Sequence, residues 1–191
     1  MKKQKLPIVE IFNSIQGEGA NSGMYATFIR LAGCNLSCAF CDTDYEVKKE
    51  MTIRKIVDWP YMLKNVVITG GEPMIHDIRP LVDVLKFDHQ VYIETNGTIH
   101  VPFYPFDAWI TVSPKDLDFV QKSGNELKVL WFGKHFIDAI DKMLFMYFNH
   151  RYIQHIEKDG KFLLVDEILQ YIERNPEWRL SMQIHKILHL K

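Results

Sequence analysis

Hydrophobic residues along this chain follow two alternating patterns. Short apolar runs rich in β-branched residues are separated by longer segments in which apolar residues recur every three or four positions. The short runs predict strands at 25–31, 66–69, 90–94, 108–112, 127–132 and 178–184. The periodic segments predict helices at 52–64, 77–87, 135–146 and 164–174. Strands that alternate with helices are typical of an α/β domain with a mainly parallel sheet.

The number of predicted elements favours an incomplete (β/α) barrel of about six mostly parallel strands, because the closed eight-unit form typically needs about 250 residues. The chain has 191 residues, so we expect a single domain, 1–191, with one active site. Two prolines fall inside predicted helices. We expect Pro60 to end its helix and Pro80 to occupy a first turn.

Polar segments directly follow the first four predicted strands. They read CNLSCAFCDTD, GGEP (70–73), ETNGT (94–98) and SPK (113–115). In a parallel sheet, the loops after the carboxyl ends of the strands open on one face. The sequence therefore predicts that these four segments meet at one site.

Composition and charge narrow the class of protein. Hydrophobic residues make up 47% and charged residues 25% of the chain, and the formal net charge is -1. These values are ordinary for a globular protein and give no reason to expect nucleic acid as a partner. No apolar run reaches the length of a signal peptide or of a membrane span. We expect a cytoplasmic protein that does not bind membranes.

All three cysteines lie within eight residues, as the C-x3-C-x2-C motif of Cys34, Cys38 and Cys41. The cytosol keeps thiols reduced, so the motif indicates metal binding or catalysis. Zinc is an alternative, although its cysteine sites usually come as two separated pairs. A [4Fe–4S] cluster takes four ligands, so three cysteines would leave one iron open to a ligand from outside the protein.

This motif, with Phe40 before the last cysteine and GGEP after the second strand, resembles the radical S-adenosylmethionine (SAM) superfamily. The resemblance implies that SAM chelates the open iron of the cluster. Reduction would then break its sulfonium bond, and the 5'-deoxyadenosyl radical would abstract a substrate hydrogen. The cofactor-binding residues that it implies are Phe40 at the adenine, Gly70, Gly71 and Glu72 at the methionine amino group, and Gly97, Ser113, Pro114 and Lys115 along the ribose and carboxylate.

Three further residues indicate the substrate. Glu18, between two glycines in SIQGEG (14–19), can accept two parallel N–H bonds from the 2-amino-pyrimidinone edge of a pterin or a guanine. Arg30 stands in an apolar strand and needs a partner, which is either a substrate carboxylate or a structural ion pair. Thr43 is a candidate magnesium ligand, with a helix cap or turn as the alternative.

Together with CDTDY, ETNGT, SPK and RLSMQIHK (179–186), SIQGEG resembles the 7-carboxy-7-deazaguanine synthase family over nearly the whole chain. The resemblance implies a lyase of queuosine and deazapurine biosynthesis that converts 6-carboxy-5,6,7,8-tetrahydropterin to 7-carboxy-7-deazaguanine with loss of ammonia. It implies Mg²⁺ at Thr43 beside the substrate carboxylate. The substrate-binding residues that it implies are Ile15, Gln16, Gly17, Glu18, Arg30, Thr95 and Gln154.

The end of the chain and its partners complete these expectations. Gln183 and His185 are expected on one face of the final strand, with His185 a possible catalytic donor or a structural residue. His155 departs from the family, which usually has a proline there. The family resemblance implies a flavodoxin or ferredoxin as reductant and a homodimer. The aromatic stretch 134–160 either packs as core or forms the dimer interface, and the resemblance favours the interface.

Two other functions stay open at this level. A glycyl-radical-enzyme activase shares the cluster motif but acts on a protein, so it would not need Glu18 or a carboxylate-binding Arg30. A non-catalytic metal-binding protein would use the cysteines to stabilise its fold, so removal of the metal would unfold it.

Overall fold

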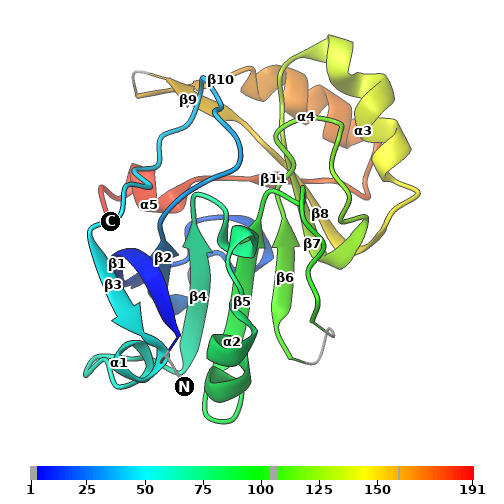
Figure 1. The fold of residues 1–191 in the computed structure, drawn as a ribbon. Helices are drawn as coiled ribbons and strands as arrows, with labels where there is room; N and C mark the ends of the chain where they lie inside the picture. The colour runs from blue at the N-terminus through cyan, green and yellow to red at the C-terminus, as the bar shows by residue number, and fades with distance from the viewer. Residues whose placement is uncertain (1–3, 104–106, 159) are drawn as a thin grey trace.

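The computed structural model describes residues 4–103, 107–158 and 160–191, which form an α/β fold around one main sheet (Figure 1). Nine strands of these residues build the sheet, in the order β11-β8-β7-β6-β5-β4-β2-β1-β3. Their bounds are β1 (Lys5–Ile15), β2 (Tyr25–Leu31), β3 (Lys49–Thr52), β4 (Asn65–Gly70), β5 (Gln90–Thr95), β6 (Trp109–Val112), β7 (Ser123–Leu130), β8 (Tyr147–Gln154) and β11 (Arg179–Ser181). A small second sheet pairs β9 (Ile156–Lys158) with β10 (Lys161–Leu163).

The sheet is mostly parallel, as predicted. All neighbours from β2 to β11 pair in parallel, and only β1 pairs antiparallel, with β2 on one side and β3 on the other. In Figure 1 the arrows of β4 and β6 point to the same end of the sheet, and the cysteine loop between β2 and β3 rises above that end. The carboxyl ends of the parallel strands therefore meet on one side.

The prediction of six strands was too low, because it missed β1, β3 and β8. β1 mixes apolar and charged residues, and only Leu6 and Ile8 in its first half are fully buried, so its period is weak. β8 lies in the aromatic stretch that was considered as an interface. Part of this stretch packs as core, since β8 is an inner strand with Phe148 and Ile153 buried, whereas Phe145 and Tyr147 are exposed.

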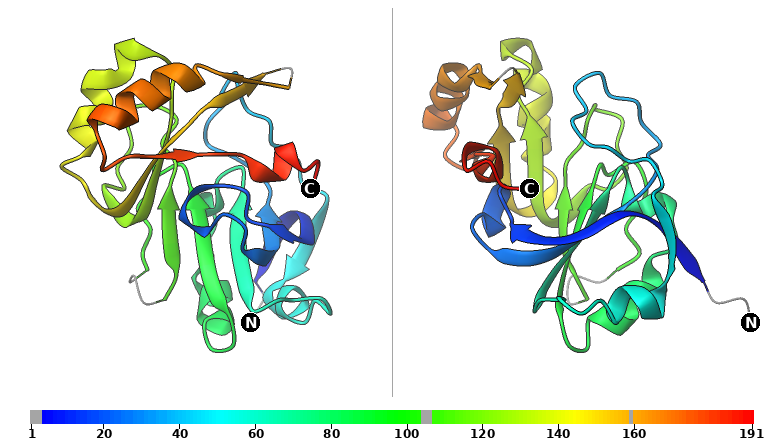
Figure 2. Two further views of the ribbon diagram at one scale, coloured as in Figure 1. Left: turned by 180° about the vertical axis from the view of Figure 1, so that it is seen from behind. Right: turned by 90° about the vertical axis from the view of Figure 1, so that its left-hand side faces the viewer.

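Four of the helices are shorter than predicted but fall in the predicted places, and the fifth, α5, was not predicted. The helices are α1 (Ile53–Val57), α2 (Arg79–Leu85), α3 (Ile137–Met143), α4 (Val165–Arg174) and α5 (Ile184–Ile187). Thr52 caps α1, whose last residue precedes Pro60 by three positions, so Pro60 lies beyond the helix rather than breaking it. Pro80 lies in the first turn of α2, as predicted. Figure 2 shows α3 and α4 together, away from α1 and α2.

The final strand was predicted too long. β11 ends at Ser181, Gln183 precedes α5, and His185 lies inside it. The prediction that Gln183 and His185 share a strand face was therefore wrong. A three-residue strand followed by one short helical turn has no sequence period long enough to separate the two. Across the described ranges, no helix is long and apolar enough to cross a bilayer.

The core packs α2 against the middle strands of the sheet. Ile68 of β4, Ile93 of β5 and Leu81 of α2 are 0% exposed and belong to one apolar cluster. Val84 lies on the same helix but is 47% exposed. Helix α2 thus has one face in the core and one face in solvent, which allows a matched comparison within a single element.

We predict that Leu81→Ala lowers the free energy of unfolding by about 2–5 kcal/mol, because it leaves a cavity in the core. Val84→Ala removes a side chain that is half in solvent and should stay within about 0.5 kcal/mol of the parent protein. Urea unfolding followed by circular dichroism measures both. Equal effects of the two substitutions would mean that α2 does not pack as described.

Candidate active site

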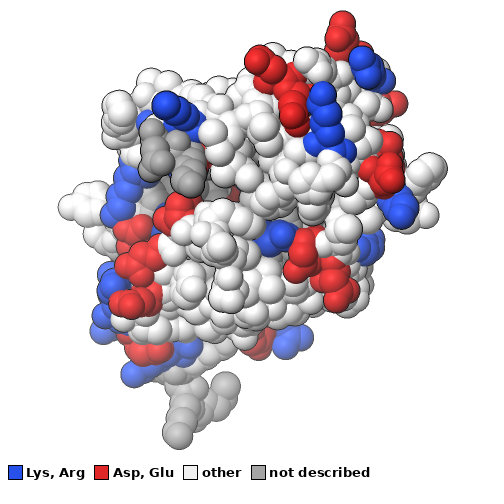
Figure 3. Space-filling view, turned by 90° about the horizontal axis from the view of Figure 1, so that it is seen from above, with Lys and Arg blue, Asp and Glu red and all other residues white. Residues whose placement is uncertain are grey.

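A cavity of about 850 Å³ lies at the carboxyl ends of the parallel strands. All four polar segments predicted to meet there contribute to its wall, through the cysteines, Gly70 and Gly71, Thr95 and Asn96, and Ser113 and Lys115. The size suits a small-molecule site that holds more than one ligand. Seen from above (Figure 3), the outer surface at this end carries Lys and Arg side chains interspersed with Asp and Glu, without a large region of one sign among the described residues.

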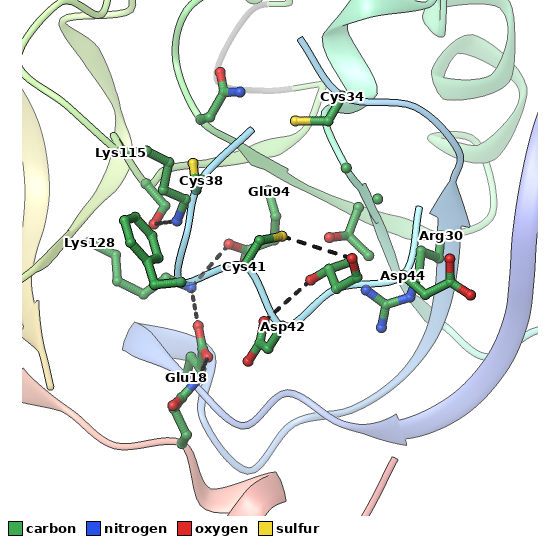
Figure 4. Close-up of a pocket in the computed structure, with 18 of the residues that line it drawn as sticks. Glu18, Arg30, Cys34, Cys38, Cys41, Asp42, Asp44, Glu94, Lys115 and Lys128 are labelled. Carbon is green, nitrogen blue, oxygen red and sulfur yellow. Dashed lines mark hydrogen bonds and ion pairs between the residues drawn. The ribbon is translucent and has the colours of Figure 1, made fainter. Parts of the chain in front are cut away.

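The three cysteines lie on the loop that follows β2, and all three line the cavity (Figure 4). Among the described residues, no three His, Cys, Asp or Glu side chains converge on a point where they could hold one metal ion. A zinc site needs such convergence, whereas each thiolate of a [4Fe–4S] cluster binds a different iron. Three thiols on one loop that line one cavity are a donor set that fits an iron–sulfur cluster.

Glycines allow the cysteine loop to pack closely on the end of β4. A Cβ atom at Gly71 would lie 2.2 Å from the carbonyl oxygen of Gly33, and the backbone N–H of Glu72 donates to that same oxygen (2.9 Å). At Gly70, which has a φ of 157°, an added Cβ atom would lie 2.2 Å from the carbonyl oxygen of Leu31. The GG pair is thus required by the close approach of two backbones.

Glu72 differs from its predicted surroundings, because its carboxylate does not line the cavity. It is 0% exposed and accepts hydrogen bonds from the backbone N–H of Met74 (3.0 Å), the hydroxyl of Thr95 (2.7 Å) and the backbone N–H of Asn96 (2.6 Å). Burial raises the pKa of Glu72, and the three donors counteract it. The carboxylate stabilises the loop after β5 in this structure, and the part of GGEP that faces the cavity is Gly70 and Gly71.

Two of the three SPK residues and Phe40 line the cavity. Lys115 is partly buried, and its Nζ donates to the hydroxyl of Ser113 (2.9 Å). Burial lowers the pKa of Lys115. Burial also raises the pKa of Cys38, and the Lys115 ammonium group only partly opposes that rise. Phe40 packs on Phe132 with ring centroids 5.2 Å apart. A partly buried ammonium group with a neutral hydroxyl partner is suited to binding an anion near the thiols.

Pro114 and Gly97 are beside the cavity rather than in its wall. Gly97 has a φ of 77°, a conformation that favours glycine, and its carbonyl oxygen accepts the backbone N–H groups of Val120 and Gln121. Their structural contribution is to turn the loops that carry Thr95 and Ser113.

Glu18 lies in the cavity wall with most of its acceptor capacity in use. Its Oε2 pairs with Lys128 Nζ (2.6 Å), and its Oε1 accepts from Gln183 (2.7 Å) and Gln154 (3.3 Å). Burial opposes ionisation, but the attraction of Lys128 dominates and lowers the pKa of Glu18 to about 2. The side chain is therefore a carboxylate throughout the neutral range.

Sequence reasoning missed Lys128 and Glu94, which lie beside Glu18 (Figure 4). Lys128 Nζ also contacts Glu94 Oε2 (3.1 Å), and Glu94 Oε1 accepts from Gln16 Nε2 (3.0 Å). The available signals were weak: Glu94 opens ETNGT, and Lys128 is a lone charge in an apolar strand, as Arg30 is. Of these two lone charges, only Arg30 was predicted to need a partner.

The other SIQGEG residues that were expected to bind substrate differ in position. Gln16 lines the cavity, whereas Ile15 and Gly17 do not. A Cβ atom at Gly17 would lie 2.0 Å from Nδ1 of His185, so the absence of a side chain there allows the imidazole to reach the cavity. Burial lowers the pKa of His185, which favours the neutral ring.

Arg30 has the structural partner that was the alternative interpretation. Its Nε pairs with Glu10 Oε1 (3.0 Å) across the β1–β2 pair, and Glu10 also pairs with Lys191. Arg30 nevertheless lines the cavity, and its two Nη atoms make no hydrogen bond to any described residue. The ion pair orients the guanidinium through Nε. The two Nη atoms, which form bidentate contacts with carboxylates, stay available to a ligand.

Thr43 and its neighbours lie at the opening between the cysteine loop and α5. The hydroxyl of Thr43 donates weakly to Asp42 (3.4 Å), whose carboxylate pairs with Lys186 (2.5 Å). Thr43, Asp42 and Asp44 all line the cavity. Oxygen ligands of this kind are those that magnesium prefers.

Comparisons with known proteins were made for the whole chain, and no protein-family model matches it. The chain is 37% identical to 7-carboxy-7-deazaguanine synthase from Burkholderia multivorans over 213 aligned positions, which cover 96% of this chain and 98% of that relative. It is 37% identical to the enzyme of that name from Bacteroides thetaiotaomicron, with the same coverage of both chains, and 36% identical to the one from Escherichia coli K12. The crystal structure of QueE from Escherichia coli superposes with a TM-score of 0.80 at 31% identity, over 94% of both chains.

We predict that Glu72→Gln lowers the free energy of unfolding by about 1–3 kcal/mol. An amide keeps one acceptor oxygen but replaces the other with an NH₂ group, which then faces one or two of the three donors and leaves buried groups without partners. Glu173→Gln, at an exposed position of α4, is the matched control and should have no measurable effect. Urea unfolding distinguishes the two, and an unchanged Glu72→Gln protein would refute the bonding described.

Proposed function

Since this chain belongs to the 7-carboxy-7-deazaguanine synthase family, we propose that its cavity converts 6-carboxy-5,6,7,8-tetrahydropterin to 7-carboxy-7-deazaguanine with loss of ammonia. The enzyme is a radical SAM lyase of queuosine biosynthesis. The observation that carries the proposal is similarity over nearly the full length of both chains, in a protein whose three thiols and carboxylate wall share one cavity.

The proposed resident cofactor is a [4Fe–4S] cluster on Cys34, Cys38 and Cys41. When bound with SAM, such a cluster supplies the electron that generates a radical able to remove the hydrogen at C6 of the substrate. The cysteine loop orients the thiolates, and its packing on Gly71 fixes them relative to the end of β4.

For SAM, we propose a site along the ends of β4 and β6. Lys115 is the partly buried cation for the carboxylate, and Ser113, which accepts its hydrogen bond, positions it. Gly70 and Gly71 offer open backbone to the methionine amino group, and Phe40 offers an aromatic face to the adenine. Glu72, Gly97 and Pro114 are proposed to support these loops.

The substrate is proposed to lie between Glu18 and Arg30. Glu18 and Gln16 provide acceptors and donors for the pterin edge, with Gln154 and Gln183 orienting Glu18. Arg30 binds the substrate carboxylate through its Nη atoms, and Thr95 lines the cavity between the two ends. Ile15 and Gly17 shape the loop, and His185 is a neutral hydrogen-bond partner near the pterin.

Thr43 is proposed to bind Mg²⁺ beside the substrate carboxylate. The ion would fix the orientation of that carboxylate as charge develops on the ring, a template role rather than activation of water. Two cavity-lining neighbours, Asp42 and Asp44, add negative charge that favours a divalent cation at this position.

The remaining partners are expectations from the family resemblance. They are a flavodoxin or ferredoxin as reductant and a second copy of the chain as a homodimer. The exposed aromatic side chains of Phe145 and Tyr147 are compatible with a contact between copies. A cytoplasmic location likewise stays a prediction.

The test is anaerobic reconstitution with iron and sulfide, followed by SAM, reductant, Mg²⁺ and 6-carboxytetrahydropterin. We expect a product with the absorbance and mass of 7-carboxy-7-deazaguanine, and Cys38→Ala should abolish SAM cleavage. Cleavage of SAM without this product would refute the substrate but keep the superfamily, and an activase would instead require a protein substrate. A domain that unfolds on chelation of iron would favour the structural use of the cysteines.

We predict that Arg30→Ala raises the KM for the pterin by roughly 10- to 100-fold, because a charged hydrogen-bonded contact contributes about 1.5–3 kcal/mol. SAM affinity should be preserved, since the side-chain ion pair of Arg30 is to Glu10 and not to a residue of the proposed SAM site. Arg79→Ala, which breaks an exposed ion pair with Asp77, is the control. Steady-state kinetics and SAM binding measure both, and equal loss of SAM and pterin affinity would mean that Arg30 is misassigned.

A further inference from the structure

Lys128 is a buried cation between two carboxylates of the cavity wall. It projects from β7, its side chain is only 6% exposed, and its Nζ contacts Glu18 at 2.6 Å and Glu94 at 3.1 Å. Those two side chains come from a loop and from β5, so Lys128 joins three segments that are distant in the sequence. Figure 4 shows Lys128 between the two carboxylates, both of which line the cavity.

The two carboxylates could not both stay ionised without a cation. Burial and the neighbouring Glu18 carboxylate raise the pKa of Glu94, and the contact with Lys128 is the main opposing influence, with a smaller one from Lys115. A third acid, Glu126, is on the same face of β7, two residues from Lys128, and its pKa is raised to about 7 by burial. Like charges in one buried site normally force one group to take up a proton.

The hydrogen bonds show how many acceptor positions a bound proton would affect in the substrate site. A carboxylate offers about four acceptor positions. Glu18 uses two on Oε1 and one on Oε2, and Glu94 uses one on each oxygen. Protonation of either group would turn one of its acceptor positions into an O–H donor, which leaves fewer positions for the N–H groups of a ligand.

Other charged groups also face this pair. They are Glu126 behind Lys128, Lys115 from the loop after β6, and two imidazoles, those of His155 and His185. Burial lowers the pKa of both imidazoles, so neither supplies a permanent cation. Lys115 pairs with Ser113. Lys128 is therefore the one of these groups in direct contact with both carboxylates.

We propose that Lys128 is the positioning residue of the substrate site: it holds Glu18 and Glu94 ionised and oriented so that they accept the N–H groups of the pterin. This inference rests on the proposed function, since it names how the same site recognises that substrate. Lys128 affects binding of the pterin edge and does not affect the cluster or SAM.

The experiment compares Lys128→Met and Lys128→Arg with the parent enzyme, using turnover of 6-carboxytetrahydropterin and equilibrium binding of 6-carboxypterin, an oxidised analogue. Lys128→Met should weaken pterin binding about tenfold or more near neutral pH and lower the thermal stability, because it leaves buried carboxylates without their cation, while SAM binding of the folded, reconstituted enzyme stays within about twofold. Lys128→Arg should recover part of the affinity. Lys134→Met, at an exposed lysine, is the control.

The pH dependence separates positioning from a merely structural contribution. Lowering the pH from about 8 to about 6 should widen the difference between Lys128→Met and the parent enzyme, because a carboxyl group without its cation takes up a proton in this range. Adding Glu94→Gln to Lys128→Met removes the second negative charge, and this extra pH dependence should disappear.

Three outcomes overturn the inference. They are unchanged pterin affinity in Lys128→Met, a loss that is independent of pH, and a parallel loss of SAM binding. A parent enzyme that neither binds 6-carboxypterin nor turns over the substrate refutes the proposed function instead, so the two failures are distinguishable.

Discussion

The site depends on one buried carboxylate that fixes the loops at the carboxyl ends of the strands. Glu72 accepts hydrogen bonds from the loop after β5, and its backbone N–H donates to Gly33 at the start of the cysteine loop. A fully buried acid is costly unless its oxygens are satisfied, so this arrangement tolerates little displacement of any of its donors. The GG pair makes the approach sterically possible, and Glu72 gives it a defined geometry. The positions of the thiols and of Thr95 follow from these contacts.

Charge balance is the second constraint on the cavity. Its wall brings together Glu18 from the loop after β1 and Glu94 from β5, and Lys128 from β7 contacts both. The energy of such groups is set by desolvation and by the nearest opposite charge, because water screens them poorly. Lys128 therefore has more influence on the chemistry of Glu18 than any residue adjacent to Glu18 in sequence. Arg30 illustrates the same principle at the other end, where Glu10 orients a guanidinium that still faces the cavity.

Both interpretations of Arg30 turned out to be compatible, and this compatibility has a geometric reason. A guanidinium has donors on two sides, so Nε can pair with a structural carboxylate while the Nη atoms face a ligand. Glu72 shows the opposite case, in which a residue of a binding motif has its oxygens occupied by the protein itself. A motif thus identifies a region of the site, and the hydrogen-bond partners identify which of its atoms face the ligand.

The sequence by itself determined what is encoded locally. The apolar runs of β2, β4, β5 and β6, the first turn of α2 at Pro80, the spacing of the cysteines and the polar residues at strand ends all follow from chemistry within a few residues. Because parallel strands end on one side, those local signals sufficed to predict one shared cavity. Only the tertiary structure decided the pairing of β1, β3 and β8, the short α5 in place of a long final strand, and the partners of Glu18. Gln183 lies 165 positions from Glu18. Burial and long-range ion pairing create the environments of Lys128 and Glu94, and no local pattern of residue types records which distant side chain will neutralise a buried charge.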